Sequence, residues 1–281
     1  MKILYVTDLH GDKNKYEKSL KLAKENNIKV IINGGDMLPK ECNRHQEQPL
    51  FITKYLREYF KELKKHGITY LAMLGNDDLL SLDKLFNDVC NEFDNVYNLA
   101  GNKVEIDGYE FIGMNYILDH PFGCKDRVVM EESYVFQGQL MPYALLSNDI
   151  GYDEIYNWFE YAAELPNMKD ILKELPKPND YDKTIYVTHI APSYLRLGQL
   201  LYQDLDIGSG DIYNFFKEKQ PLLTLHGHIH ESPDTEKGKW INTLNNTTCI
   251  NPGQTELNGD LVYADIDLDN KVYKRGKNSF R

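Results

Sequence analysis

The chain begins with Lys2-Ile-Leu-Tyr-Val-Thr-Asp8-Leu-His10-Gly-Asp12, a run of β-forming residues that ends abruptly in polar ones. Residues 3–7 predict a buried strand, and Asp8 and His10 follow it directly. Side chains two positions apart on a strand point to the same face, so this carboxylate and this imidazole can converge on one point. Ligands of open α/β sheets bind beyond the carboxyl ends of the strands, where such a pair indicates a metal. Most pairs of this kind bind nothing, so the hypothesis depends on further ligands at the same edge of the sheet.

Two more predicted strands end in the same way. Residues 29–33 lead into Gly34-Gly35-Asp36, and residues 69–74 lead into Gly75-Asn76-Asp77-Asp78. Apolar side chains recur with helical spacing before each of these strands, which predicts helices at residues 13–26 and 48–65. Alternation of strands and helices predicts parallel pairing with right-handed crossovers. Three polar loops are therefore expected at one edge of the sheet.

The middle of the chain, residues 116–182, reads as an insertion. A hairpin is predicted just before it, with strands at 104–106 and 109–114. The segment is rich in proline and aromatic residues, and only two short helices are predicted in it, near 153–163 and 168–175. Segments of this size with little periodicity rarely fold alone. We therefore expect residues 1–281 to form a single domain, in which this rim insertion forms a lid or a substrate-specificity region.

Regular structure resumes after the insertion, and histidines mark the ends of the strands. Residues 184–188 predict a strand that ends in His189, and residues 222–225 predict one that ends in His226-Gly227-His228-Ile229-His230. A helix is expected between them, near 211–218. The remaining residues predict short strands near 239–242, 249–251 and 261–267.

Composition limits the function classes. The chain has 281 residues and a formal net charge of −11, which argues against a groove for duplex nucleic acid. Short oligonucleotides or cyclic dinucleotides remain open, because bound cations reverse the local sign of the charge. No apolar run is long enough for a membrane span, and the N-terminal residues do not resemble a signal peptide. The four cysteines are scattered, as is typical of free thiols, so a cytoplasmic protein is expected.

Seven side chains that can bind a metal stand at the ends of five predicted strands, each close to a glycine or a turn residue. They are Asp8, His10, Asp36, Asn76, His189, His228 and His230. Seven oxygen and nitrogen ligands exceed what one zinc ion needs. Two ions that share one carboxylate fit the number better.

The spacing of these residues resembles that of the calcineurin-like metallophosphoesterases. The matching blocks are Asp8-x-His10, Gly35-Asp36, Gly75-Asn76-x-Asp78, His189 and Gly227-His228-x-His230. The tail of the match, residues 225–232 and then 251–253, is similar to the small prokaryotic branch of predicted phosphoesterases. The resemblance implies an α/β fold, a four-layer αββα sandwich of two mixed sheets flanked by helices. The strands of the tail would belong to the second sheet.

The resemblance also implies a ligand set and a reaction. One divalent metal would be held by Asp8, His10 and His230, the other by Asn76, His189 and His228, and Asp36 would bridge them. A hydroxide shared by two such ions attacks phosphorus in line, which hydrolyses a phosphodiester or a phosphomonoester. Mixed nitrogen and oxygen ligands suit manganese, iron, zinc, nickel or cobalt. The expected partner is a small phosphoester, with nucleotides among the candidates.

One position departs from the family. The residue after Asn76 is usually a histidine that protonates the leaving group or steadies the phosphoryl group, and here it is Asp77. A carboxylate beside an anionic substrate is repulsive unless it is protonated or points away. A carboxylic acid with a raised pKa can still serve as a general acid. We therefore treat Asp36, Asn76 and Asp77 as the catalytic candidates, and we expect a preference for diesters or aryl esters, whose leaving groups need less protonation.

Some of the other polar residues are candidates for contact with the substrate. Arg44 and His45 follow Asp36 in a loop that would border the metals, although such a pair is also typical of a solvated loop. His120 opens the insertion and is a candidate for a lid, whereas His66 and His226 are expected to be structural.

Two alternative functions stay open. A non-catalytic metal-binding scaffold of the same fold is one, although all seven ligand positions are retained. A nuclease that acts on short oligonucleotides is the other.

Overall fold

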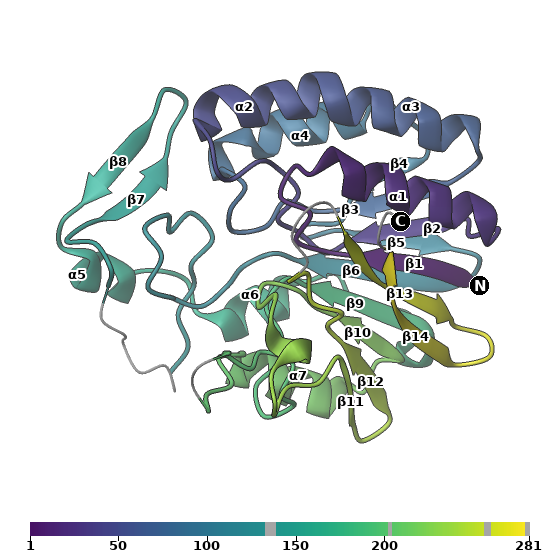
Figure 1. Cartoon of the computed structure of the whole chain (residues 1–281). Coiled ribbons are helices and arrows are strands. Elements are labelled where there is room, and N and C mark those ends of the chain that lie inside the picture. The colour runs from purple at the N-terminus through teal and green to yellow at the C-terminus, as the bar shows by residue number, and fades with distance from the viewer. Residues whose placement is uncertain (133–138, 202–203, 256–259, 279–281) are drawn as a thin grey trace.

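The chain folds into four layers, two sheets packed face to face with helices on both outer sides (Figure 1). The computed structural model describes residues 1–132, 139–201, 204–255 and 260–278. This is the predicted four-layer αββα sandwich. Among the described residues, none of the helices combines the length and the apolar composition that a bilayer span requires.

The first sheet carries the opening strand at its centre, in the order β14-β13-β1-β2-β3-β4. Strands β1, β2 and β3 run parallel to one another, as the sequence predicted, and β4, which was not predicted, extends this parallel set. Strand β13 pairs antiparallel with β1. The bounds are β1 Lys2–Val6, β2 Val30–Asn33, β3 Thr69–Ala72, β4 Val96–Asn98, β13 Leu261–Asp267 and β14 Val272–Asn278. The expectation that all strands of the tail lie in the second sheet was wrong for β13. This strand covers the free edge of β1 with its backbone, and its alternating apolar side chains are buried on the sheet's faces.

Helices and a π-helical turn cover the outer face of this sheet. They are α1 Lys13–Glu25, α2 Arg44–Leu50, the π-helical η1 Phe51–Leu56, α3 Arg57–Lys65 and α4 Asp83–Cys90, which follows the short 3-10 turn η2 Leu80–Leu82. The predicted helix at 48–65 begins earlier, at Arg44, and Pro49 lies inside it. Helix α4 was not predicted. Its apolar side chains Phe86 and Val89 pack into the core under β3 and β4, but it is too short to show a clear period.

The second sheet has the order β11-β12-β10-β9-β6-β5. Its strands are β5 Lys103–Ile106, β6 Tyr109–Met114, β9 Thr184–Thr188, β10 Leu223–Leu225, β11 Ile241–Leu244 and β12 Thr247–Ile250. The predicted hairpin is β5 and β6, and β9 and β10 lie parallel at the centre. Ile3 and Val30 of the first sheet share one buried cluster with Phe111 and Val187 of the second. This apolar contact fixes the two sets of strand ends relative to each other.

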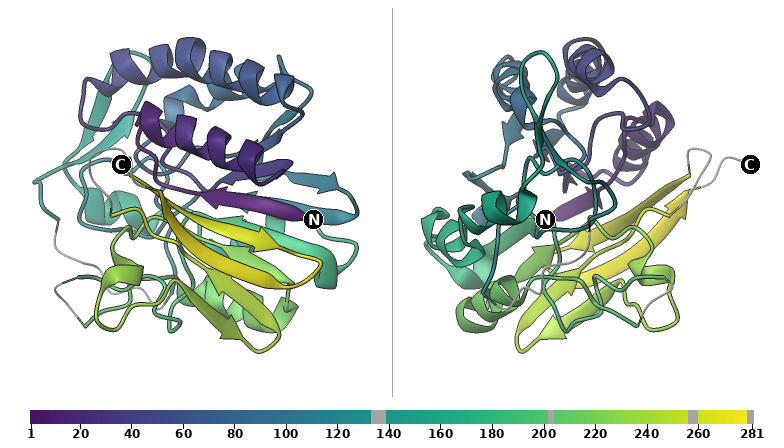
Figure 2. Two further views of the ribbon diagram at one scale, coloured as in Figure 1. Left: turned by 45° about the vertical axis from the view of Figure 1, so that its right-hand side comes forward. Right: turned by 90° about the vertical axis from the view of Figure 1, so that its left-hand side faces the viewer.

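The segment 116–182 extends past the edge to which β1 runs (Figure 2). It contains the hairpin β7 Ala144–Ser147 and β8 Tyr152–Ile155, the helices α5 Trp158–Ala163 and α6 Met168–Glu174, and the turn η3 Tyr181–Lys183. The helix predicted near 153–163 was therefore wrong in its first part, because residues 152–155 pair with β7. Helix α6 packs beside α7 Gly210–Lys219 on the outer side of the second sheet. The hairpin and α5 stand out beyond the strand ends, at the left of Figure 1.

Candidate metal centre

A first group of metal-competent side chains gathers where β1 ends. Ligand atoms of Asp8, His10, Asp36 and His230 all lie within 4.8 Å of one another. The Nε2 atoms of His10 and His230 are 3.1 Å apart, and Asp8 Oδ1 lies 3.4 Å from His230 Nε2. Two imidazole nitrogens and two carboxylates aimed at one point form a typical divalent-metal environment.

A second group shares Asp36 with the first. Ligand atoms of Asp36, His189 and His228 lie within the same 4.8 Å limit, and His189 Nε2 is 2.9 Å from Asn76 Oδ1. His189 donates its Nδ1–H to the carbonyl of Gly34, which leaves Nε2 directed at the site. Asp36 Oδ2 is 3.4 Å from His189 Nε2 and 3.9 Å from His10 Nε2, so this one carboxylate faces both groups.

The backbone is unusual at four of these residues. Asp8, His10, Asp36 and His228 have φ angles of 55°, 45°, 52° and 67°, in a region that costs a residue other than glycine about 1–3 kcal/mol. Hydrogen bonds between the loops hold these conformations, including Asp8 N–H to Gly35 C=O and His10 N–H to Asp36 C=O. Left-handed turns directly after the strands are what aim these side chains across the edge of the sheets.

Glycines under the site leave room for the side chains of the two groups. A Cβ atom on Gly35 would collide with the ring of His189, one on Gly75 with Asp36, and one on Gly227 with Asp8. Gly35 also has a φ of 116°, which L side chains rarely adopt. Each of these glycines thus leaves room for a ligand side chain of another sequence block, within the first sheet for Gly75 and across the two sheets for Gly35 and Gly227.

The chemistry of these residues fits divalent cations. Asp8 Oδ2, His10 Nδ1 and His228 Nε2 are buried polar atoms without a hydrogen-bond partner among the described residues. Burial lowers the pKa of His10 to about 3, so its imidazole is neutral and can act as a ligand. Burial also acts against protonation of His189, but Asp36 outweighs it and raises the pKa of His189 to about 9. Buried carboxylates need a positive partner, and a pair of divalent cations held by these side chains would supply it.

Asp78 organises the loops beneath the site. Its buried carboxylate accepts hydrogen bonds from the backbone N–H groups of Met37, Leu38 and Gly75. The loop after β2 and the loop after β3 are therefore tied together directly beneath Asp36. Gln48 of α2 adds a second tie, because it donates to the carbonyl of Asp77 and accepts from Leu79 N–H.

Asp77 lies at the site together with two cations. Its carboxylate is 3.0 Å from Arg44 Nη2 and 3.7 Å from Lys40 Nζ. Burial and the neighbouring Asp36 raise the pKa of Asp77, and Arg44 and Lys40 oppose that rise. Lys40 Nζ also lies 3.2 Å from His10 Nε2. Lys40 was missed by the sequence reasoning, although its position four residues after Asp36 was a usable signal.

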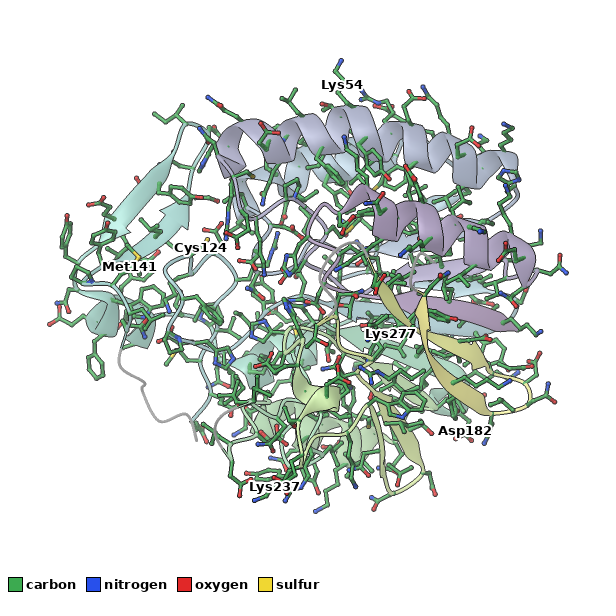
Figure 3. All side chains as sticks on the ribbon, viewed as in Figure 1. Lys54, Cys124, Met141, Asp182, Lys237 and Lys277 are labelled. Atoms are coloured by element: carbon green, nitrogen blue, oxygen red, sulfur yellow. The ribbon has the colours of Figure 1, made fainter. Side chains whose placement is uncertain are left out.

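His45 and His120, the other candidates for contact with the substrate, have different neighbours. His45 packs edge-on against Tyr152 of β8, with ring centroids 4.5 Å apart, so it connects α2 to the hairpin. His120 stacks on His228, at 5.0 Å and an interplanar angle of 27°. The loop that carries His120 also contains Cys124, which Figure 3 places between the hairpin and the layered body.

His66 and His226 have structural surroundings. His66 ends α3, and its Nε2 is 3.8 Å from Glu62. The ring nitrogens of His226 lie 2.9 Å from Thr188 Oγ1 and 2.8 Å from Thr224 Oγ1 in the core, where burial lowers the pKa of this histidine to about 3. These contacts agree with the expectation that neither side chain belongs to the site.

Residues 1–232 match the family model described as calcineurin-like phosphoesterase, a range that includes all seven side chains of the two groups. Among solved structures, the chain is similar to TT1561 of Thermus thermophilus, with a TM-score of 0.57 and 18% identity over 98% of this chain and 97% of that one. It is also similar to a dimetal phosphatase from Danio rerio, with a TM-score of 0.50 and 10% identity over 94% of this chain and 92% of that one. At these identities the likeness to solved structures shows the fold alone. No curated protein matches the sequence.

Proposed function

Because this chain belongs to the calcineurin-like phosphoesterase family, we propose that it hydrolyses small phosphodiesters or phosphomonoesters at the two ligand groups around Asp36. The protein is a metal-dependent phosphoesterase with a dimetal centre. The observation that carries the proposal is the position of Asp36, whose Oδ2 faces His10 on one side and His189 on the other.

The proposed ligand sets follow the two groups. Asp8, His10 and His230 would hold one ion, with Asp36 shared. His189, His228 and Asn76 would hold the other, and the Asn76 side-chain oxygen supports this because it lies 2.9 Å from His189 Nε2. When bound, such a pair of ions supplies a hydroxide at neutral pH and stabilises charge on a phosphoryl group. Manganese is one candidate among several metals that suit these ligands.

Arg44 and Lys40 supply the positive charge at the site that the phosphate group needs. Both side chains are partly exposed and both contact Asp77. We propose that Asp77 acts mainly by orienting these two cations, since a carboxylate paired with an arginine stays ionised more readily than an isolated buried one. A guanidinium and an ammonium then bind the phosphoryl oxygens, which limits the repulsion that Asp77 alone would cause.

The substrate specificity is proposed to reside in the segment 116–182. The hairpin β7–β8 reaches α2 through the contact of Tyr152 with His45, close to the residues that would bind phosphate. A substrate of nucleotide size would contact this hairpin, which would act as a lid. A cytoplasmic location is proposed from the scattered free cysteines.

The test combines metal analysis with turnover. The purified chain is loaded with Mn²⁺, its metal content is measured, and hydrolysis of an aryl phosphodiester and an aryl phosphomonoester is followed. We expect two ions per chain and turnover that Asp36→Asn abolishes, whereas Asp94→Asn on the surface leaves it unchanged. Two bound ions without turnover of either ester would favour a binding scaffold and would contradict the proposed reaction.

A further inference from the structure

His120 is an imidazole at the metal centre that the ligand sets do not use. It comes from the loop after β6, and its ring stacks on that of His228 at 5.0 Å and 27°. Phe122 of the same loop approaches His228 edge-on at 6.3 Å. The loop therefore places one polar and one apolar ring against a residue of the second ligand group.

Both ring nitrogens of His120 are buried without a hydrogen-bond partner among the described residues. The residue as a whole is only 3% exposed. A buried polar atom that lacks a partner destabilises the fold, and a phenyl ring would fill the same space without this cost. An imidazole at this position is explained if a ligand that is not part of the protein takes up its hydrogen bond.

The backbone on both sides of His120 is held firmly. Lys125 forms a buried ion pair with Asp119, with 2.7 Å between Nζ and Oδ1, and it also donates to the carbonyl of His120. Trp158 of α5 donates its indole N–H to the other oxygen of Asp119 at 3.0 Å. These contacts fix the backbone of the loop, and with it the position from which the imidazole extends toward His228.

The hydrogen-bond donors around Asp36 are unevenly placed. Lys40 and Arg44 lie beside Asp77, and Lys40 contacts His10 of the first group. Asp77 offers an acceptor in place of a donor. His120 stands on the side of the second group, against His228, where it complements the two cations.

We propose that His120 contacts the substrate directly and donates a hydrogen bond from its neutral imidazole to a phosphoryl oxygen bound beside His228. This role rests on the proposed function, because it assigns the residue to the same phosphate-binding site. It makes the loop 119–127 part of the phosphate site itself, with Lys125 and Asp119 as positioning residues.

The test uses the metal-loaded full chain and inorganic phosphate as the probe, with affinity measured by calorimetry. His120→Phe removes the donor and keeps a ring of similar shape. We expect it to weaken phosphate binding about tenfold or more, which is the loss for one hydrogen bond to a charged group. The metal content should stay at the wild-type value, and the Tm of the metal-free protein should stay equal or rise, because two unpaired nitrogens leave the interior. His120→Gln should restore part of the affinity, and His66→Gln serves as the matched control without effect.

Two results would overturn the proposal. Wild-type phosphate affinity in His120→Phe would show that the imidazole makes no contact with the anion. A fall in Tm and in metal content that His120→Gln repeats would show a purely structural role. Failure of the proposed function looks different, since the wild-type protein itself would then neither bind phosphate nor hydrolyse either ester.

Discussion

Arg127→Met should destabilise the protein and disturb the site at the same time. Arg127 is one of the largest fully buried side chains, and it reaches from the segment 116–182 to the loop after β3. Its Nε donates to the carbonyl of Gly75 at 2.7 Å, and its guanidinium pairs with Asp83 at the start of α4. Gly75 directly precedes Asn76, so loss of the guanidinium releases the backbone that carries a proposed ligand.

The expected loss of stability depends on the groups that Arg127→Met leaves without a partner. Removing one partner of a buried ion pair costs about 3–5 kcal/mol, and the Asp83 side chain is 42% exposed, which places this case at the lower end. The unpaired Gly75 carbonyl is part of that loss. We therefore expect the free energy of unfolding to fall by about 3 kcal/mol, with a reduced affinity for the metal at Asn76.

Urea denaturation of the metal-free and metal-loaded protein measures both effects. Arg57→Met is the matched control, because Arg57 makes a two-pronged pair with Glu92 on the surface, where such pairs contribute roughly 0–1 kcal/mol. The reasoning would be refuted if the two variants lost the same stability, or if Arg127→Met lost stability and kept wild-type metal affinity.

Three further predictions concern the metals, a glycine and a core histidine. Mn²⁺ at a hundredfold excess over its Kd should stabilise the chain by about 2.7 kcal/mol for each ion bound, read as a rise in Tm that a chelator reverses. No change in Tm would contradict the buried ligand groups. Gly35→Ala should sharply lower the metal affinity, because the new Cβ atom collides with His189. Gly101→Ala is the control, since Gly101 has open space around it and the substitution should cost only backbone strain. Equal metal affinities of the two variants would refute the collision. The pKa of His226 is about 3 in the folded chain, below its ordinary value of 6.5. Between these two values the unfolded chain binds a proton that the folded chain does not, so the free energy of unfolding should fall as the pH drops below about 6.5. His226→Asn should flatten that part of a urea-unfolding series against pH, and an unchanged slope would rule out His226 as the source.

The edge of the sheets that carries the site was predictable from sequence because it depends on local rules. Parallel strands place their carboxyl ends together, and the polar residues after β1, β2 and β3 had to meet there. Asp8, Asp36 and His189 indeed lie together, although they are far apart in the chain. The glycine blocks were also readable, but which side chain each glycine accommodates required the coordinates.

The missed features depend on contacts between segments that are distant in sequence. Arg127 carries no local pattern, and its contact with Gly75 follows from the packing of loops that are distant in sequence. The position of Lys40 four residues after Asp36 was a signal, but its contact with His10 depends on how the two loops pack. Strand β13 was predicted near 261–267, but periodicity alone does not show which of the two sheets a strand joins, so its pairing with β1 required the coordinates. Residues 153–155 were assigned to a helix because their pairing with β7 depends on a hairpin within an irregular segment.

The central claim is that two metal ions share Asp36, and anomalous diffraction from crystals grown with Mn²⁺ tests it most directly. The account predicts two manganese peaks, one contacted by Asp8, His10 and His230 and the other by Asn76, His189 and His228, with the Asp36 carboxylate touching both. A single peak at this edge of the sheets, or two peaks with Asp36 bound to only one of them, would contradict it.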